Sequence, residues 1–182
     1  MKGFIHARLI KRYKRFLADV RLDNDEVTTV HCPNTGSMKN CVEENAEIWL
    51  SDSDNPKRKY RYTWEYLKTS GGHHIGVNAG NANQLVESAI RDDLVEQLAG
   101  YETIRPEVKY GDENSRIDLL LQDIKRQDCF VEVKSVTLLE DPSSRGIGYF
   151  PDAVSERGSK HLRELIRMSQ SDARSVLFFC VQ

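Results

Sequence analysis

Two short apolar segments that carry acidic side chains constrain the fold of this chain more than any other feature. Residues 115–121 contain Asp118, and residues 129–134 contain Glu132 and Lys134. A polar stretch joins the two segments, so the pattern predicts a β-hairpin. Burying a charge is costly unless it is paired or binds a metal. Acids placed in such strands therefore indicate a candidate site.

The residue types in this predicted hairpin suit phosphodiester chemistry. Glu132 and Lys134 are two positions apart and should point to the same face of a sheet. Asp118 and Glu132 can hold Mg²⁺ or Mn²⁺, with the carbonyl of Val133 as a further oxygen, and the ion would polarise a phosphate. Lys134 would position water and offset developing charge. The alternative is a solvated sheet face with an incidental Glu–Lys pair.

The first part of the chain alternates apolar and polar residues over short distances. The alternation predicts strands at residues 4–10, 15–22, 27–32, 46–50 and 58–67. Five short strands in so few residues indicate a small all-β, OB-like barrel. Gly and Asn become frequent after residue 70, which places a domain boundary near residue 80. We therefore expect an OB-like nucleic-acid-binding domain over residues 1–80 and a second domain over residues 81–182.

Basic and aromatic residues interleave at two places in the predicted barrel. Positive charge follows phosphates and aromatic faces stack on bases, so both places are candidate nucleic-acid contacts. The alternative is that the aromatic residues fill the barrel core while the Lys and Arg side chains are solvated outside it. The candidate contact residues are Lys11, Arg12, Lys14, Arg15, Lys57, Arg58 and Lys59.

From residue 85 the apolar period becomes helical. It continues to residue 98, before Gly100, and Asn83 is the expected N-cap. A strand near residues 104–108, the two acidic strands, a helix over residues 155–168 and a strand over residues 175–181 follow. This order predicts an α/β domain with the acids on a central sheet.

An aspartate followed by Glu-x-Lys on a hairpin resembles the core of the PD-(D/E)xK nuclease superfamily, whose domain has a restriction-endonuclease-like fold. Longer strings spread over nearly the whole chain resemble the bacterial and archaeal family of sugar fermentation stimulation protein A (SfsA). These strings are RYKRFLADV (12–20), HCPNTGSM (31–38), SDNPKRKY (53–60), SRID (115–118), VEVKSVTL (131–138), FPDAV (150–154), ERG (156–158) and KHLREL (160–165).

The resemblance implies an amino-terminal OB-like domain, a carboxy-terminal PD-(D/E)xK nuclease-like domain and DNA binding with weak sequence preference. It also implies a part in regulating maltose metabolism. The family continues beyond the position that matches Gln182, through a further helix and strand. Two functions stay open, a metal-dependent phosphodiesterase and a non-catalytic DNA-binding regulator. The preference for single- or double-stranded DNA and the formation of a homo-oligomer are open as well.

The resemblance also directs attention to the two predicted helices. In PD-(D/E)xK enzymes an acid on the first helix supports the site, which makes Glu87 a candidate catalytic residue, in competition with Asp92, Asp93 and Glu96. On the second helix, the resemblance implies that three residues reach the cleft, although periodicity alone puts them on the polar face of the helix. These are Arg157, Lys160 and His161.

The bulk composition fits a globular protein. The chain has 182 residues, a formal net charge of −2 and 39% hydrophobic residues. It contains no apolar run long enough for a transmembrane helix and no secretory signal pattern, so we expect a cytoplasmic protein without a membrane partner. Its four cysteines show no Cys-x-x-Cys spacing, which indicates reduced thiols.

Overall fold

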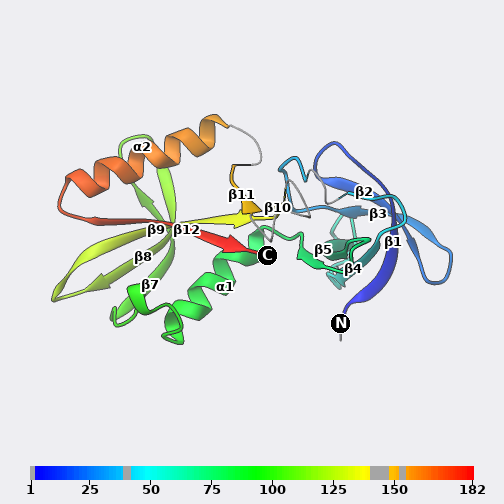
Figure 1. Cartoon of the computed structure of the whole chain (residues 1–182), viewed down its shortest axis with the longest axis horizontal. Coiled ribbons are helices and arrows are strands. Elements are labelled where there is room, and N and C mark those ends of the chain that lie inside the picture. The colour runs from blue at the N-terminus through cyan, green and yellow to red at the C-terminus, as the bar shows by residue number, and fades with distance from the viewer. Residues whose placement is uncertain (1–2, 39–41, 140–147, 152–154) are drawn as a thin grey trace. The chain divides into compact units, whose positions relative to one another are not determined.

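The computed structural model describes residues 3–38, 42–139, 148–151 and 155–182 (Figure 1). The chain divides into two compact units. The first comprises Met1–Gly80, Val136–Ala153 and Val181–Gln182, and the second comprises Asn81–Ser135 and Val154–Cys180. None of the described helices combines the length and the apolar character needed to cross a membrane.

The first unit contains a closed five-stranded barrel, as the sequence predicts. A parallel pairing of β3 with β5 joins the outer strands in the order β3-β2-β1-β4-β5 and closes the barrel. A sixth strand that the sequence did not predict, β6, extends the sheet beyond β5. The strands are β1 (Ile5–Tyr13), β2 (Leu17–Leu22), β3 (Val27–His31), β4 (Glu47–Asp52), β5 (Tyr62–Lys68) and β6 (His74–Gly76).

Alternation of side chains within each strand fills the barrel core. Trp64 is fully buried, and its indole Nε1 donates to the carbonyl oxygen of Tyr66 at 2.9 Å, so this aromatic residue belongs to the core. Strand β5 begins at Tyr62, and the prediction that it begins at residue 58 is wrong because residues 56–57 form a turn and residues 59–61 a bend. The buried apolar residues include Leu9, Val20, Val30, Ile48, Leu50, Trp64 and Leu67.

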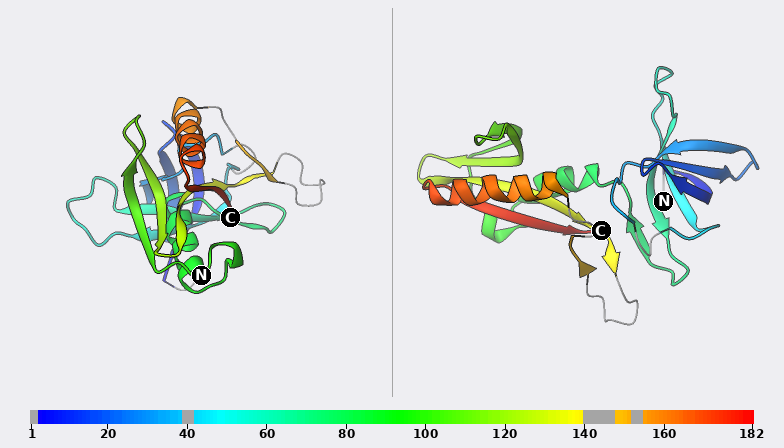
Figure 2. Two further views of the ribbon diagram at one scale, coloured as in Figure 1. Left: turned by 90° about the vertical axis from the view of Figure 1, so that its left-hand side faces the viewer. Right: turned by 90° about the horizontal axis from the view of Figure 1, so that it is seen from above.

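The second unit is a four-stranded sheet with a helix on each face (Figure 1). The strand order is β12-β9-β8-β7, and Figure 2 shows α2 lying lengthwise over β9 and β12. A separate two-stranded pairing, which belongs to the first unit, joins β10 (Leu138–Leu139) and β11 (Gly148–Tyr149). The elements of the second unit are α1 (Gly80–Arg91), a 3₁₀ turn (Glu96–Leu98), β7 (Thr103–Tyr110), β8 (Ser115–Asp123), β9 (Arg126–Val136), α2 (Glu156–Gln170) and β12 (Arg174–Val181).

Each helix covers one face of this sheet with an apolar stripe. Val86 and Ile90 of α1 pack in one cluster with Leu119 and Val131, whereas Leu165 of α2 packs in another with Leu120. The helix α2 begins where the Ser155 hydroxyl accepts a hydrogen bond from the main-chain N–H of Gly158, which is an ordinary N-cap.

The bounds predicted for the first helix are wrong. The helix begins at Gly80, whose N–H donates to the side-chain oxygen of Asn78 at 3.1 Å, so Asn83 lies inside the helix and does not cap it. It ends at Arg91 because Asp93 adopts a left-handed conformation with φ of 55°. The later part of the apolar pattern forms the 3₁₀ turn instead.

The described cysteines Cys32, Cys129 and Cys180 are free thiols, and Cys41 lies outside the described residues.

Candidate functional site

The predicted acidic hairpin is confirmed, and it brings the two carboxylates together. Strands β8 and β9 are antiparallel, with Leu119 opposite Val131, so Asp118 and Glu132 occupy the next positions along the ladder. The side chain of Asp118 enters the ladder at this point, because its Oδ2 accepts a hydrogen bond of 2.7 Å from the N–H of Val133.

Glu132 is almost completely buried, with 2% of its surface exposed. Its Oε1 contacts both Nζ of Lys134 and Nδ1 of His161, which belong to β9 and α2. Its Oε2 is buried and has no hydrogen-bond partner among the residues that the structure describes. A buried carboxylate oxygen without a partner costs free energy, so a ligand that bonds to this oxygen would recover that cost.

Asp118 is held on both oxygens by neutral donors. Its Oδ1 accepts a hydrogen bond of 2.8 Å from the side-chain amide of Asn83 on α1. Burial raises the pKa of Asp118 above its ordinary value, and the nearby charge of Glu132 raises it further. The site therefore concentrates negative charge that a cation would stabilise.

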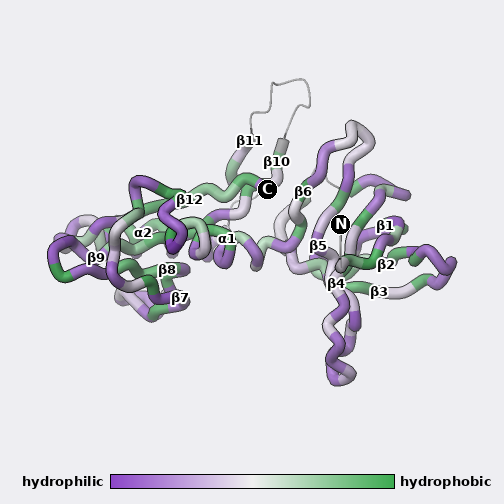
Figure 3. Tube along the Cα trace, turned by 90° about the horizontal axis from the view of Figure 1, so that it is seen from below, coloured by the Kyte–Doolittle hydropathy of each residue, from purple (hydrophilic) through white to green (hydrophobic). Residues whose placement is uncertain are grey.

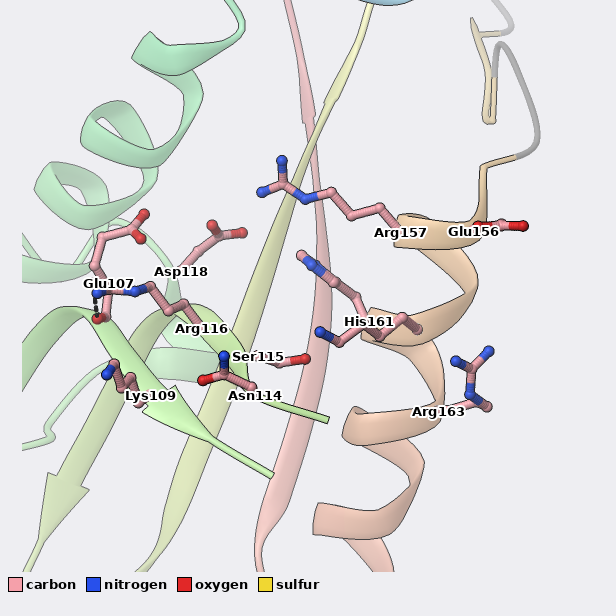
Figure 4. Close-up of a pocket in the computed structure, with 11 residues that line it drawn as sticks. Glu107, Lys109, Asn114, Ser115, Arg116, Asp118, Glu156, Arg157, His161 and Arg163 are labelled. Carbon is pink, nitrogen blue, oxygen red and sulfur yellow. Dashed lines mark hydrogen bonds between the residues drawn. The ribbon is translucent and has the colours of Figure 1, made fainter. Parts of the chain in front are cut away.

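A pocket of about 770 Å³ opens beside these residues, between β7, β8 and α2. Figure 4 shows Asp118, Arg157 and His161 extending into the space between β8 and α2. Five Lys and Arg side chains line the pocket against three carboxylates, a balance that suits a phosphate-bearing ligand. The lining residues are Glu107, Lys109, Asn114, Ser115, Arg116, Asp118, Glu156, Arg157, Lys160, His161 and Arg163.

Of the helix residues that the resemblance assigns to the site, those on α2 line the pocket and the one on α1 does not. Arg157, Lys160 and His161 lie in the pocket lining, where the family resemblance had pointed. Glu87 does not line the pocket, and it pairs with Arg91 one turn along the same helix at 2.6 Å. The residue of α1 that supports the site is Asn83, one turn before Glu87.

Sequence reasoning missed two further contributors. Lys109 lines the pocket from β7, a strand that the sequence predicted only to residue 108. The sequence pattern predicts Asn83 as a helix N-cap, because Asn is common at that position. The spacing of Asn83 and Glu87, four residues apart on one helix face, is the only signal that indicates Asn83 as an alternative to the acid.

The donor set fits a hard divalent cation. Asp118 and Glu132 supply carboxylate oxygens, which Mg²⁺ and Ca²⁺ prefer. In the part of the chain that the structure describes, no three His, Cys, Asp or Glu side chains are grouped to hold a metal ion. Main-chain, water or substrate oxygens would therefore complete the coordination, as is usual for Mg²⁺.

In the barrel, the structure gives Arg12 a different role from the predicted phosphate contact. Its guanidinium donates to the carbonyl oxygens of Arg15, Asn34, Gly36 and Ser37 at 2.7, 2.9, 2.8 and 3.4 Å. These contacts fold the segment after β3 against the turn between β1 and β2. Arg12 is therefore an internal clamp whose two terminal guanidinium nitrogens are occupied, whereas its buried Nε has no hydrogen-bond partner among the described residues.

The other basic residues of the barrel lie mainly in two loops. Lys14 and Arg15 form the β1–β2 turn, and Lys57, Arg58 and Lys59 lie in the β4–β5 loop, a hydrophilic extension in Figure 3. Lys11 lies on β1 and pairs with Asp19 at 3.5 Å.

Both loops reach the end of β3. The carbonyl of Phe16 accepts a hydrogen bond from the N–H of Cys32 at 2.8 Å. The side chain of Arg58 donates to Thr63, which lies opposite His31. The two basic loops therefore flank one part of the barrel.

Family models match both halves of the chain. The model described as "SfsA N-terminal OB domain" matches residues 10–77, and the model described as "Sugar fermentation stimulation protein RE domain" matches residues 80–182. Together they cover most of the sequence and assign each half separately.

Related proteins agree with the family models. The sugar fermentation stimulation protein homologs of Shewanella pealeana and Psychromonas ingrahamii are each 58% identical, over 96% of this chain and 73% and 77% of their own length. The solved structure of Pyrococcus furiosus SfsA in complex with Ca²⁺ matches 98% of this chain and 73% of its own chain. The TM-score of 0.84 at 24% sequence identity shows a shared fold. The chain belongs to the sugar fermentation stimulation protein (SfsA) family.

Proposed function

We propose that this protein binds nucleic acid and hydrolyses its phosphodiester bonds with a divalent cation held by Asp118 and Glu132. The observation that carries the proposal is the state of Glu132. Its carboxylate is buried, Lys134 and His161 hold one oxygen, and the other oxygen has no partner in the described part of the chain. It lies next to a pocket lined by more basic than acidic side chains.

The residues around the pocket would have different roles in phosphodiester hydrolysis. A bound Mg²⁺ or Mn²⁺ would supply Lewis-acid polarisation of a phosphate oxygen. Lys134 lies beside Glu132 with 17% of its side chain exposed, close enough to the surface to orient water and to offset charge that develops on the phosphate. Arg157 and Lys109 line the pocket, where they would bind the phosphates on either side of the reacting one.

The barrel would add a second contact with the same nucleic acid. The loops that carry Lys14, Arg15, Lys57, Arg58 and Lys59 flank the end of β3, and loops between these strands are where OB barrels bind oligonucleotides. Phe16 is 45% exposed beside Lys14 and Arg15, so its ring is available to stack on a base. We propose DNA as the partner, and we place no contact on Arg12.

A divalent cation in a protein of this fold supports the metal part of the proposal. The P. furiosus SfsA structure is described as a complex with Ca²⁺. Ca²⁺ and Mg²⁺ both take oxygen ligands, so a site built from carboxylates can accept either ion. Mg²⁺ or Mn²⁺ is the ion that we propose for catalysis.

A cleavage assay tests the proposal. Purified protein is incubated with end-labelled single- and double-stranded DNA and RNA, with Mg²⁺, Mn²⁺ or EDTA. We expect metal-dependent products from the wild type, and a loss of about 10²–10³-fold in rate for Lys134→Ala, which removes one charge-stabilising donor. Lys125→Ala is the matched control, because Lys125 is exposed in the turn of the same hairpin and should leave the rate unchanged.

The second candidate function is a DNA-binding regulator that cleaves nothing. The two basic loops of the barrel favour it, because they can bind a backbone without any metal. Folded protein that retains DNA in a salt-dependent manner but releases no product with any of the substrates would reject the nuclease and support this alternative.

A further inference from the structure

We infer that His161 is a positioning residue that presents the free oxygen of Glu132 to the divalent cation, an inference that rests on the proposed function. The two residues are 29 positions apart and belong to α2 and β9. Nδ1 of His161 contacts Oε1 of Glu132, and 9% of the histidine is exposed. Their meeting therefore depends on how α2 packs on the sheet.

The two donors on Oε1 differ in how firmly they can hold it. Lys134 is two residues along the same strand and ends in a flexible four-carbon side chain. The imidazole of His161 is rigid, and its helix is fixed to the sheet by buried Leu165 one turn further on. His161 is thus the donor that fixes the rotation of the carboxylate.

Fixing Oε1 determines what Oε2 can do. With two donors on Oε1, the buried Oε2 has no partner within residues 3–38, 42–139, 148–151 and 155–182 and stays available as an acceptor. A carboxylate that binds a metal is itself usually oriented by such hydrogen bonds, and removal of the partner typically weakens metal binding by about 10–100-fold. Nδ1 is occupied by Glu132, so His161 acts through that residue.

Isothermal titration with Mn²⁺ tests the inference without any nucleic acid. We compare the wild type with His161→Asn, whose amide nitrogen lies near the former Nδ1, and with His161→Gln, whose amide nitrogen lies near the former Nε2. His161→Ala removes the donor entirely. His73→Ala is the control, because His73 is exposed in a loop of the barrel.

The expected result is an affinity about 10–100-fold weaker for His161→Ala and His161→Gln, with most of the loss recovered in His161→Asn and no change in the control. Thermal unfolding in EDTA establishes that each variant is folded. If the alanine variant does not fold, the comparison of Mn²⁺ affinity between the Asn and Gln variants still tests whether the Nδ1 donor is needed.

Two outcomes would overturn the inference while leaving the proposed cation site in place. Wild-type Mn²⁺ affinity in His161→Ala or His161→Gln would show that the donor is unnecessary. Equal weakening in the Asn and Gln variants would assign the effect to packing of the ring. A wild-type protein that binds no Mn²⁺ would instead reject the cation site of the proposed function, and this inference would fall with it.

Discussion

Two glutamates of the second unit are equally buried but differ in what surrounds them. Glu164 on α2 is fully buried, and its carboxylate accepts hydrogen bonds from the N–H groups of Asp112 and Glu113 at 3.3 and 2.6 Å. Arg167 lies 3.4 Å from the same oxygen that Glu113 contacts. Both oxygens of Glu164 thus accept hydrogen bonds, whereas Oε2 of Glu132 accepts none from any residue that the structure describes.

The difference separates a structural charge from a candidate functional one. Glu164 fastens the turn between β7 and β8 to α2, so its charge is used within the protein. Glu132 retains unused bonding capacity next to the pocket. Burial alone therefore does not distinguish the two glutamates, whereas the Glu132 oxygen without a partner among the described residues makes Glu132 the candidate cation ligand.

Neutralising each glutamate in turn tests whether Glu132 and Glu164 differ in function. We expect Glu132→Gln to lower metal-dependent cleavage by about 10²–10³-fold or more, because it removes a charge that stabilises the reacting centre. Glu164→Gln should keep the cleavage rate per folded molecule close to that of the wild type. Single-turnover rates on one labelled oligonucleotide give both values, and equal losses would mean that the two glutamates do not differ in function.

The surroundings of Glu164 can be tested through Gly111. This glycine has φ of +68°, and a Cβ atom there would lie 1.7 Å from the Oε2 of Glu164. Gly111→Ala should lower the free energy of unfolding by about 3 kcal/mol, because it adds a steric clash to an unfavourable backbone conformation. Urea denaturation measures the change, and an unchanged midpoint would show that the turn is not held against α2.

The barrel offers the same contrast between two basic residues. Arg12→Ala removes donors from four main-chain carbonyl groups and should lower the free energy of unfolding by about 2 kcal/mol. Lys14→Ala should leave stability unchanged and weaken DNA binding. Denaturation and fluorescence anisotropy with labelled DNA separate the two effects, and a stable Arg12→Ala variant with impaired binding would reverse the assignment.

The smallest expected effect concerns the pH dependence of stability. The folded-state pKa of Asp118 is raised above 3.8, so its contribution to stability is full below that value and is lost as pH rises through the folded-state pKa. Asp118→Asn should therefore be more stable than the wild type at neutral pH without metal, with the difference shrinking as pH falls. Thermal unfolding in EDTA from pH 7 to pH 4 measures it, and a difference that grows toward acid would contradict the assignment.

The parts of the fold that were predictable depend on local patterns. Period-two alternation gave the barrel strands and the hairpin of Asp118 and Glu132, because a half-buried strand imposes that pattern directly. The first helix was placed wrongly because its apolar period continues past Asp93, where the backbone turns left-handed. A periodic pattern does not reveal such a break.

The candidate site depends on contacts that no local pattern specifies. His161 reaches Glu132 only because α2 packs on the sheet, and periodicity puts it on the polar face of its helix. Arg12 and Lys14 look alike in a basic, aromatic string, yet only Arg12 is enclosed by main-chain carbonyl groups. The role of each charged residue follows from its neighbours in space.

The most direct test of the central claim is to locate Mn²⁺ by anomalous scattering in crystals of the metal-loaded protein. We expect a peak beside Oε2 of Glu132 and the carboxylate of Asp118, absent in Glu132→Gln, and no peak at Glu164. Full Mn²⁺ occupancy elsewhere, with nothing between Asp118 and Glu132, would contradict it.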